Sequence, residues 1–146
     1  YNETLKEEDE YFIEGIVEFN NEIYSMYGKK EIEDDEQEIE FKISLNENTY
    51  VVLEQEVENN EQEYSYKYYE NNKKIYQTEL EFEDNEITFK EKNSEGKKKY
   101  SFKFINDHQV KAKIKINEET FYLLINIELN ELNEKVYTII NNESNK

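Results

Sequence analysis

Alternation of apolar and polar residues at every second position is the feature that most constrains how this chain can fold. From Glu38 onward the pattern recurs in segment after segment, and the positions between the apolar residues are mostly Glu, Lys, Ser or Gln. Successive side chains of a strand point to opposite faces of a sheet, so the pattern is typical of strands with one buried and one wet face. The apolar positions are Ile39, Phe41, Ile43, Leu45; Tyr64, Tyr66, Tyr68; Tyr76, Leu80, Phe82; Ile87, Phe89; Tyr100, Phe102, Phe104; Val110, Ala112, Ile114, Ile116; and Phe121, Leu123, Ile125, Ile127, Leu129.

Short polar segments separate these strands. Asn and Asp tolerate left-handed backbone geometry and bond neighbouring amides, so they can close hairpins in a chain with only 3 glycines. Consecutive hairpins predict an antiparallel meander of about eight or nine strands over residues 38–140, ending with KVYTII at Lys135–Ile140 and followed by a frayed tail, 141–146. The turn segments are NENT at 46–49, ENNEQ at 58–62, ENNKK at 70–74, EDNE at 83–86, NSEGK at 93–97, NDHQ at 106–109 and NEET at 117–120.

The N-terminal segment supports two interpretations. A capping box at Thr4–Glu7 predicts a helix over about residues 4–28, with Gly28 at its exit. Its apolar face would consist of Leu5, Phe12, Ile16, Phe19, Ile23 and Tyr27. Against the helix, Gly15 lies in mid-segment and Tyr11, Ile13, Val17 and Phe19 alternate as in a strand, which leaves open a strand pair joined at Asn20 and Asn21. We expect the helix.

These elements predict a single domain, residues 1–146, of the mainly β (α+β) class. A meander with one apolar face must cover that face, so we expect a curved antiparallel sheet, a barrel or half-barrel, packed on the N-terminal amphipathic helix and joined to it by an acidic loop at about 29–38. In outline this is similar to lipocalin-like barrels and to the half-barrels of lipoprotein-carrier proteins. The chain lacks the tryptophan that lipocalins usually show near their start.

Charge is distributed unevenly along the chain, whose formal net charge is -18. Residues 1–63 carry a net charge of -17, with the run EIEDDEQEIE at 31–40 as the negative pole, whereas Glu86–Ile116 carries +5. A strongly negative potential repels phosphate backbones, so we expect no direct binding of nucleic acid. A lysine strip on the outer side of two neighbouring strands is expected to balance acids across the sheet. Its members are Lys99, Lys103, Lys111, Lys113 and Lys115.

No arrangement of residues indicates catalysis, so we expect a protein that is not an enzyme and that has no cofactor and no metal. The chain has 0 Cys, which excludes thiolate zinc sites and Cys nucleophiles. His108, the single histidine, is expected in an exposed turn beside Asp107. A calcium site at Asp34, Asp35 and Glu36 is conceivable, but EF-hand spacing is absent from the sequence.

The compartment is indicated only weakly. The sequence has no run of 18 apolar residues, so we expect no transmembrane segment. Tyr1 in place of Met favours a processed bacterial product that is secreted or lipid-anchored, although trimming of the chain would look identical.

Two functions of different classes follow. The first is a non-catalytic binding protein, expected to be monomeric, whose concave aromatic-lined face takes a small apolar or amphipathic ligand through Tyr64, Tyr66, Tyr68, Tyr76, Phe82 and Phe102. The alternative is an acidic inhibitor or immunity-type protein that binds a basic protein by mimicking the charge of nucleic acid. Its binding residues would be Glu31, Glu33, Asp34, Asp35 and Glu36. A third hypothesis is a structural module that assembles through edge strands.

Overall fold

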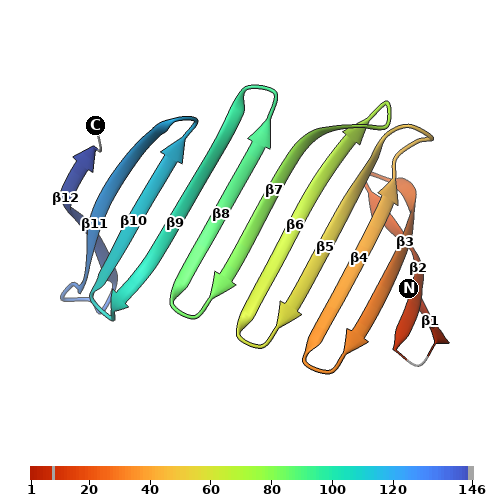
Figure 1. Ribbon diagram of the computed structural model, residues 1–146, viewed down its shortest axis with the longest axis horizontal. Coiled ribbons are helices and arrows are strands. Elements are labelled where there is room, and N and C mark those ends of the chain that lie inside the picture. The colour runs from red at the N-terminus through yellow and green to blue at the C-terminus, as the bar shows by residue number, and fades with distance from the viewer. Residues whose placement is uncertain (8, 145–146) are drawn as a thin grey trace.

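The part of the chain that the structure describes is one antiparallel sheet of 12 strands, whose order in space is their order in the sequence (Figure 1). The computed structural model describes residues 1–7 and 9–144. The strands are β1 Asn2–Glu7, β2 Glu10–Phe19, β3 Glu22–Glu33, β4 Glu36–Ser44, β5 Tyr50–Glu58, β6 Glu61–Glu70, β7 Lys73–Glu83, β8 Glu86–Asn93, β9 Gly96–Asn106, β10 Gln109–Ile116, β11 Glu119–Leu129 and β12 Lys135–Ser144. The edge strands β1 and β12 lie at opposite ends of the long axis.

Tight turns built on left-handed Asn and Asp residues join most of these strands, as the sequence predicts. At the β2–β3 turn, Asn20 and Asn21 have φ angles of 50° and 62°. Other left-handed residues lie at the hairpin turns, where a β-branched residue would be strained. They are Asp34, Asn59, Asn71, Asn72, Asp84, Asn117 and Asn133.

Strand registers give the sheet two chemically distinct faces, because residues directly opposite each other point to the same side. One face, called here the aromatic face, carries the apolar residues of the strands in which apolar and polar residues alternate. One of its rows runs across six strands from β6 to β11 as Tyr64, Leu80, Phe89, Tyr100, Ile114 and Phe121. The other face, called here the charged face, carries most of the Glu and Lys residues between them.

The sheet is an open single layer. In the described part of the chain, strands make substantial contacts only with their neighbours in the sequence. The molecule exposes 11137 Å² of surface, whereas a compact protein of its mass would expose about 8,000 Å². Among its described apolar side chains only Ile13, Val110 and Ala112 are buried, at 3%, 5% and 2% exposure. Both faces are therefore accessible over most of their area.

The expected N-terminal helix over residues 4–28 is wrong, and the strand pair joined at Asn20 and Asn21 is confirmed. The period-two residue Ile13 is buried, whereas Ile16 and Ile23 of the expected helical face are 69% and 66% exposed. Gly28 is no helix exit. It lies opposite Phe41, and a Cβ there would come within 2.7 Å of the Phe41 ring. Pairing with β4 therefore overrides the local helix signals.

Three further expectations differ from the structure: the acidic loop, the closure of the sheet and the frayed tail. The acidic loop expected at 29–38 is the β3–β4 hairpin, in which only Asp34 and Asp35 lie outside the strands. The sheet does not close into a barrel or half-barrel, since β1 and β12 are its two edges. The eight or nine strands expected over residues 38–140 are confirmed as the nine strands β4–β12, and β1–β3 extend the described sheet to 12 strands in place of the helix. The tail expected to fray from residue 141 continues β12 as far as Ser144, and residues 145–146 lie outside the described residues.

Substitution at Asn59 tests the role of the left-handed turns. Its φ is 49°, a conformation that costs an L-residue without a short polar side chain about 1 kcal/mol. Asn59→Ala is therefore expected to lower the free energy of unfolding by about this amount in urea titrations, and Asn59→Gly to be neutral or stabilising. Asn60→Ala is the matched control; equal losses at both positions would contradict the prediction.

Candidate functional site

The six aromatic residues predicted to bind a ligand lie on the same face of the sheet. Tyr64, Tyr66 and Tyr68 come from β6, Tyr76 and Phe82 from β7, and Phe102 from β9. Tyr68 lies directly opposite Tyr76, and Ile87 of β8 stands between Phe82 and Phe102 in one row. Alternation within strands and the antiparallel register between them place all six together on the aromatic face.

Ring contacts hold this cluster in place. The centroids of Tyr64 and Phe82 lie 6.2 Å apart at an interplanar angle of 88°, and those of Tyr66 and Tyr76 lie 6.1 Å apart at 67°. Such edge-to-face pairs each contribute about 1 kcal/mol beyond the area they bury. Tyr68 completes the group, and its hydroxyl donates to Glu70 Oε1 at 2.8 Å.

Polar groups border the cluster. The Tyr64 hydroxyl donates to Gln62 Oε1 at 3.2 Å and accepts from Gln55 Nε2 at 3.2 Å. Burial, followed by the charge of Glu91, raises the pKa of Tyr76. The cluster therefore presents ring surfaces in its middle and hydrogen-bonding groups around them.

The aromatic cluster is an open surface and does not line the concave interior expected from a barrel. Tyr64 is 37% exposed, and the other five side chains are half-buried among their neighbours in the sheet. Tyr76 borders a hollow of about 240 Å³ beside the β6–β7 turn. A molecule that binds to the cluster would therefore lie across the sheet.

Tyr69 interrupts the polar side of β6, and the structure shows what covers it. Its ring stacks on Tyr50 of β5 with centroids 4.6 Å apart and an interplanar angle of 14°. Lys42 Nζ lies 4.1 Å from the centroid of Tyr50. This contact on the charged face was missed in the sequence, where the only signal was two tyrosines that break the alternation.

The predicted acidic residues divide between two places. Glu31, Glu33 and Glu36 lie on the charged face, and Asp34 and Asp35 lie in the β3–β4 turn. The register continues them into two glutamate rows, which sequence reasoning missed. The first row is Glu10, Glu31, Glu38, Glu56, Glu63 and Glu81, and the second is Glu33, Glu36, Glu58, Glu61, Glu83 and Glu86.

Within the glutamate rows, the surroundings of Glu63 and Glu83 oppose their ionisation. Burial, followed by repulsion from Glu81, raises the pKa of Glu63, and repulsion from Glu61 raises the pKa of Glu83. Like charges directly opposite each other in a sheet are destabilising. The rows are therefore an arrangement that folding alone disfavours.

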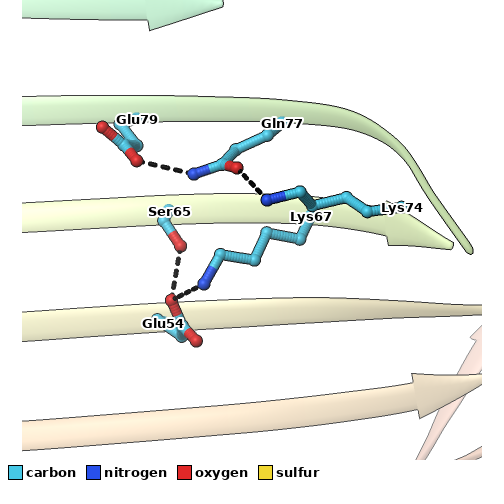
Figure 2. Close-up of polar contacts among 6 residues, drawn as sticks. All are labelled: Glu54, Ser65, Lys67, Lys74, Gln77 and Glu79. Carbon is cyan, nitrogen blue, oxygen red and sulfur yellow. Dashed lines mark hydrogen bonds and ion pairs between the residues drawn. The ribbon is translucent and has the colours of Figure 1, made fainter. Parts of the chain in front are cut away.

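Glutamates of the charged face that lie outside the two rows have hydrogen-bond donors beside them (Figure 2). Glu54 Oε2 accepts from Ser65 Oγ at 2.7 Å and from Lys67 Nζ at 2.6 Å. Burial alone would raise the pKa of Glu54, but these two donors lower it below its ordinary value. On β7, Gln77 accepts from Lys74 Nζ at 2.6 Å and donates to Glu79 Oε1 at 2.6 Å.

Three carboxylates form the one group among the described residues that brings enough ligand atoms together for a metal ion. Atoms of Glu63, Glu79 and Glu81 lie within 4.8 Å of one another. Lys90 Nζ hydrogen-bonds to Glu81 and lies 3.4 Å from Glu79. An ammonium group therefore already balances two of the three carboxylates, which reduces the need for a metal ion.

Lysines of β8, β9 and β10 form a block beside the glutamate rows. This lysine block consists of Lys90, Lys92, Lys97, Lys99, Lys103, Lys111, Lys113 and Lys115. The predicted placement of the lysine strip on one face is confirmed by the register, in which Lys99 lies opposite Lys115 and Lys103 lies opposite Lys111. Of the expected balancing of acids by the strip, the register shows Glu86 opposite Lys103. The carboxylate contacts recorded for the block within the described residues are those of Lys90, which lies outside the predicted strip.

Comparison with models of protein families, with curated proteins and with solved structures found no match to this chain. No helix in the described residues is long and apolar enough to cross a membrane. His108 lies in the exposed β9–β10 turn beside Asp107, as predicted. The chemistry of the two faces is therefore the guide to function.

Neutralising Glu63 tests the repulsion within the glutamate rows. A carboxyl whose pKa is raised in the folded state destabilises the fold while it is ionised, so its penalty is present at pH 7 and disappears as the pH falls through the raised pKa toward the unfolded value of about 4.3. Glu63→Gln is expected to raise the free energy of unfolding at pH 7 by up to about 1 kcal/mol. Denaturant titrations at pH 7 and pH 4 measure this gain, which should vanish at the lower pH.

Glu47, in the exposed β4–β5 loop, supplies the matched control. Glu47→Gln should leave the stability unchanged at both pH values. A Glu63→Gln variant that is less stable than the parent at pH 7 would show that the rows do not repel as described.

Proposed function

We propose that the chain is a non-catalytic binding protein that takes an apolar or amphipathic ligand on its aromatic face. The observation that carries the proposal is an aromatic and aliphatic face that no second layer of the described chain covers. Soluble monomers rarely expose contiguous apolar patches larger than a few hundred Å², and larger patches mark sites of interaction.

The extent of the face supports the same proposal. Its apolar rows run from β4 to β11, which corresponds to about 34 Å at a strand spacing of about 4.8 Å. The surface of the molecule exceeds that of a compact protein by about 3,000 Å². Covering this area with a ligand would remove much of the excess from water.

The chemistry of the cluster indicates the kind of ligand. Rings at its centre favour an apolar chain or ring, and hydroxyl and amide groups of Tyr64, Gln55 and Gln62 at its border favour a polar end group. Since the face is open, the ligand best suited to it is extended and lies along or across the strands.

Titration with dodecyl maltoside below its critical micelle concentration tests this proposal. Backbone NMR shifts are expected to change at β6, β7 and β9. The double variant Tyr64→Ser, Phe82→Ser removes one ring contact pair and should weaken binding at least tenfold, since each buried ring contributes roughly 1.5–3 kcal/mol.

Tyr27 and Ile23 provide the matched control because they are exposed on the charged face, at 56% and 66%. Their double substitution by Ser should leave the affinity unchanged. Shifts confined to the charged face, or equal losses in both double variants, would refute the proposal.

The glutamate rows favour a second candidate function, the binding of a basic protein. Burial followed by repulsion raises the pKa of Glu63, and repulsion raises the pKa of Glu83. A cationic partner placed over the rows would therefore stabilise the ionised form of these carboxylates. Of the residues predicted from the sequence, Glu31, Glu33 and Glu36 belong to these rows.

Calorimetric titration with decalysine tests this candidate. The variant Glu31→Gln, Glu36→Gln is expected to weaken binding several-fold at 50 mM salt, and the difference should shrink at 300 mM salt because screening reduces both affinities. Glu118→Gln, Glu119→Gln at the β10–β11 turn is the control of equal charge. Decalysine that does not bind at low salt would exclude this function.

A further inference from the structure

Lysines of β8, β9 and β10 meet one another directly across the sheet. The register places Lys90 opposite Lys99, Lys92 opposite Lys97, and Lys103 opposite Lys111. Lys99 has a second lysine, Lys115, on its other side. Like charges at directly opposed positions are destabilising, so the lysine block, like the glutamate rows, is disfavoured by folding alone.

Ion pairs within the chain do not relieve this repulsion. Within the described residues, Lys90 is the one member of the block with a carboxylate oxygen within 4.0 Å. Lys113 has a different partner, the ring of Tyr122, whose centroid is 5.7 Å from its Nζ. The remaining six ammonium groups therefore keep their positive charge available to a molecule from outside.

Two adjoining hollows lie among these lysines. One, of about 430 Å³, is bordered by Lys90, Lys92 and Lys97, and the other, of about 450 Å³, by Lys103, Lys111 and Lys113. Both are also bordered by Lys99 and Lys115. The hollows therefore form a depression along β8–β10 that is bordered mainly by cationic groups, with Glu79 and Glu91 at the rim of the first hollow and Glu86 at the rim of the second.

We propose that the lysine block binds a linear phosphate polymer, which lies along the strands over β9. Lysine is a compact point charge with three donors, suited to phosphate oxygens that it can approach from several directions. The block spans about 10 Å across three strands and about 20 Å from Lys97 to Lys103, which is the footprint of one extended polyanion chain.

The neighbouring glutamate rows restrict the ligand to this narrow shape. They lie on the same open face, so a flat anionic surface pressed against the lysines would also meet the carboxylates of β4–β7. A single chain over β9 lies about 10 Å from β7, which matches the Debye length of about 10 Å at 0.1 M salt. Glu86 of β8, opposite Lys103, is then the member of the glutamate rows that the chain approaches more closely.

Nucleic acid strands fit the block less well than a simple phosphate polymer. Proteins that bind single strands stack the bases on aromatic side chains in addition to contacting phosphates. On the charged face beside the block the ring that the structure shows in contact with a lysine is Tyr122. The block therefore offers phosphate contacts with little provision for bases.

Calorimetric titration of the full chain with long-chain inorganic polyphosphate at 0.1 M salt tests the proposal. The variant Lys99→Gln, Lys115→Gln removes the two lysines that border both hollows, and at roughly fivefold per lysine it should weaken binding at least tenfold. Its thermal unfolding midpoint should equal or exceed that of the parent, since the substitutions remove a Lys–Lys pair. Lys73→Gln, Lys74→Gln at the β6–β7 turn is the control of equal charge and should bind as the parent does.

Three results would overturn the inference: no measurable binding of polyphosphate at 0.1 M salt, equal losses in the two double variants, or tighter binding of a single-stranded oligonucleotide or of phosphatidylserine vesicles than of polyphosphate. Each probe is titrated separately, so these outcomes are distinguishable. The aromatic face is not involved in any of these titrations, and the result is independent of the proposed function.

Discussion

The backbone hydrogen-bond ladder between consecutive strands is the interaction on which everything else in this molecule depends. Among the described residues, β2 to β11 each pair with the strands before and after them, and substantial contacts join no other pair of strands. A ladder of this kind requires short turns of the correct hand, and left-handed residues such as Asn20, Asn71 and Asn117 supply them where glycine is scarce. Because the turns are short, each strand returns beside its predecessor in a fixed register. That register decides which side chains become neighbours on each face.

Much of this arrangement could be predicted from the sequence, and the missing parts have a common physical reason. Alternation identifies strands and the residues that share a face, so Tyr64 and Phe102 were correctly placed together although they lie three strands apart. Alternation carries no information on whether the sheet closes into a barrel, because an open sheet and a barrel have the same pattern within each strand. The prediction for the N-terminal segment failed because Ile16 and Ile23 fit a helical face, whereas pairing between strands, of β2 with β3 and of β3 with β4, decided the outcome.

For the candidate surfaces, too, the sequence predicts which residues of one strand share a face and does not predict their neighbours on other strands. Alternation within one strand predicts that Lys99 and Lys103 share a side, whereas Glu31 and Glu36 belong to two strands and were expected in a loop. Charge rows require the register between strands. Glutamates placed at equal distances from a hairpin turn meet across it, as Glu56 and Glu63 do around Asn59 and Asn60. An asymmetry of charge along the sequence thereby becomes a boundary across the sheet. The boundary falls at β8, where Lys90 meets Glu79 and Glu81 of β7 and Glu86 lies opposite Lys103 of β9. The aromatic face shows no such boundary, because its apolar positions recur in strands on both sides of it.

In the described chain, substantial contacts join only strands that follow one another in the sequence. The energetics of the sheet are therefore close to those of a one-dimensional array of strands. Its free energy of folding is then close to a sum over strands and over the interfaces between adjacent strands, as in repeat proteins. Contact order is low for an all-β chain, so the loop-closure entropy that slows most sandwiches and barrels is small here. Opening from either edge disrupts one interface at a time, which predicts a gradient of amide exchange protection that rises from β1 and β12 toward the middle strands. The strands that carry the aromatic cluster and the charge boundary, β6 to β9, occupy the part of that gradient where local opening is rarest.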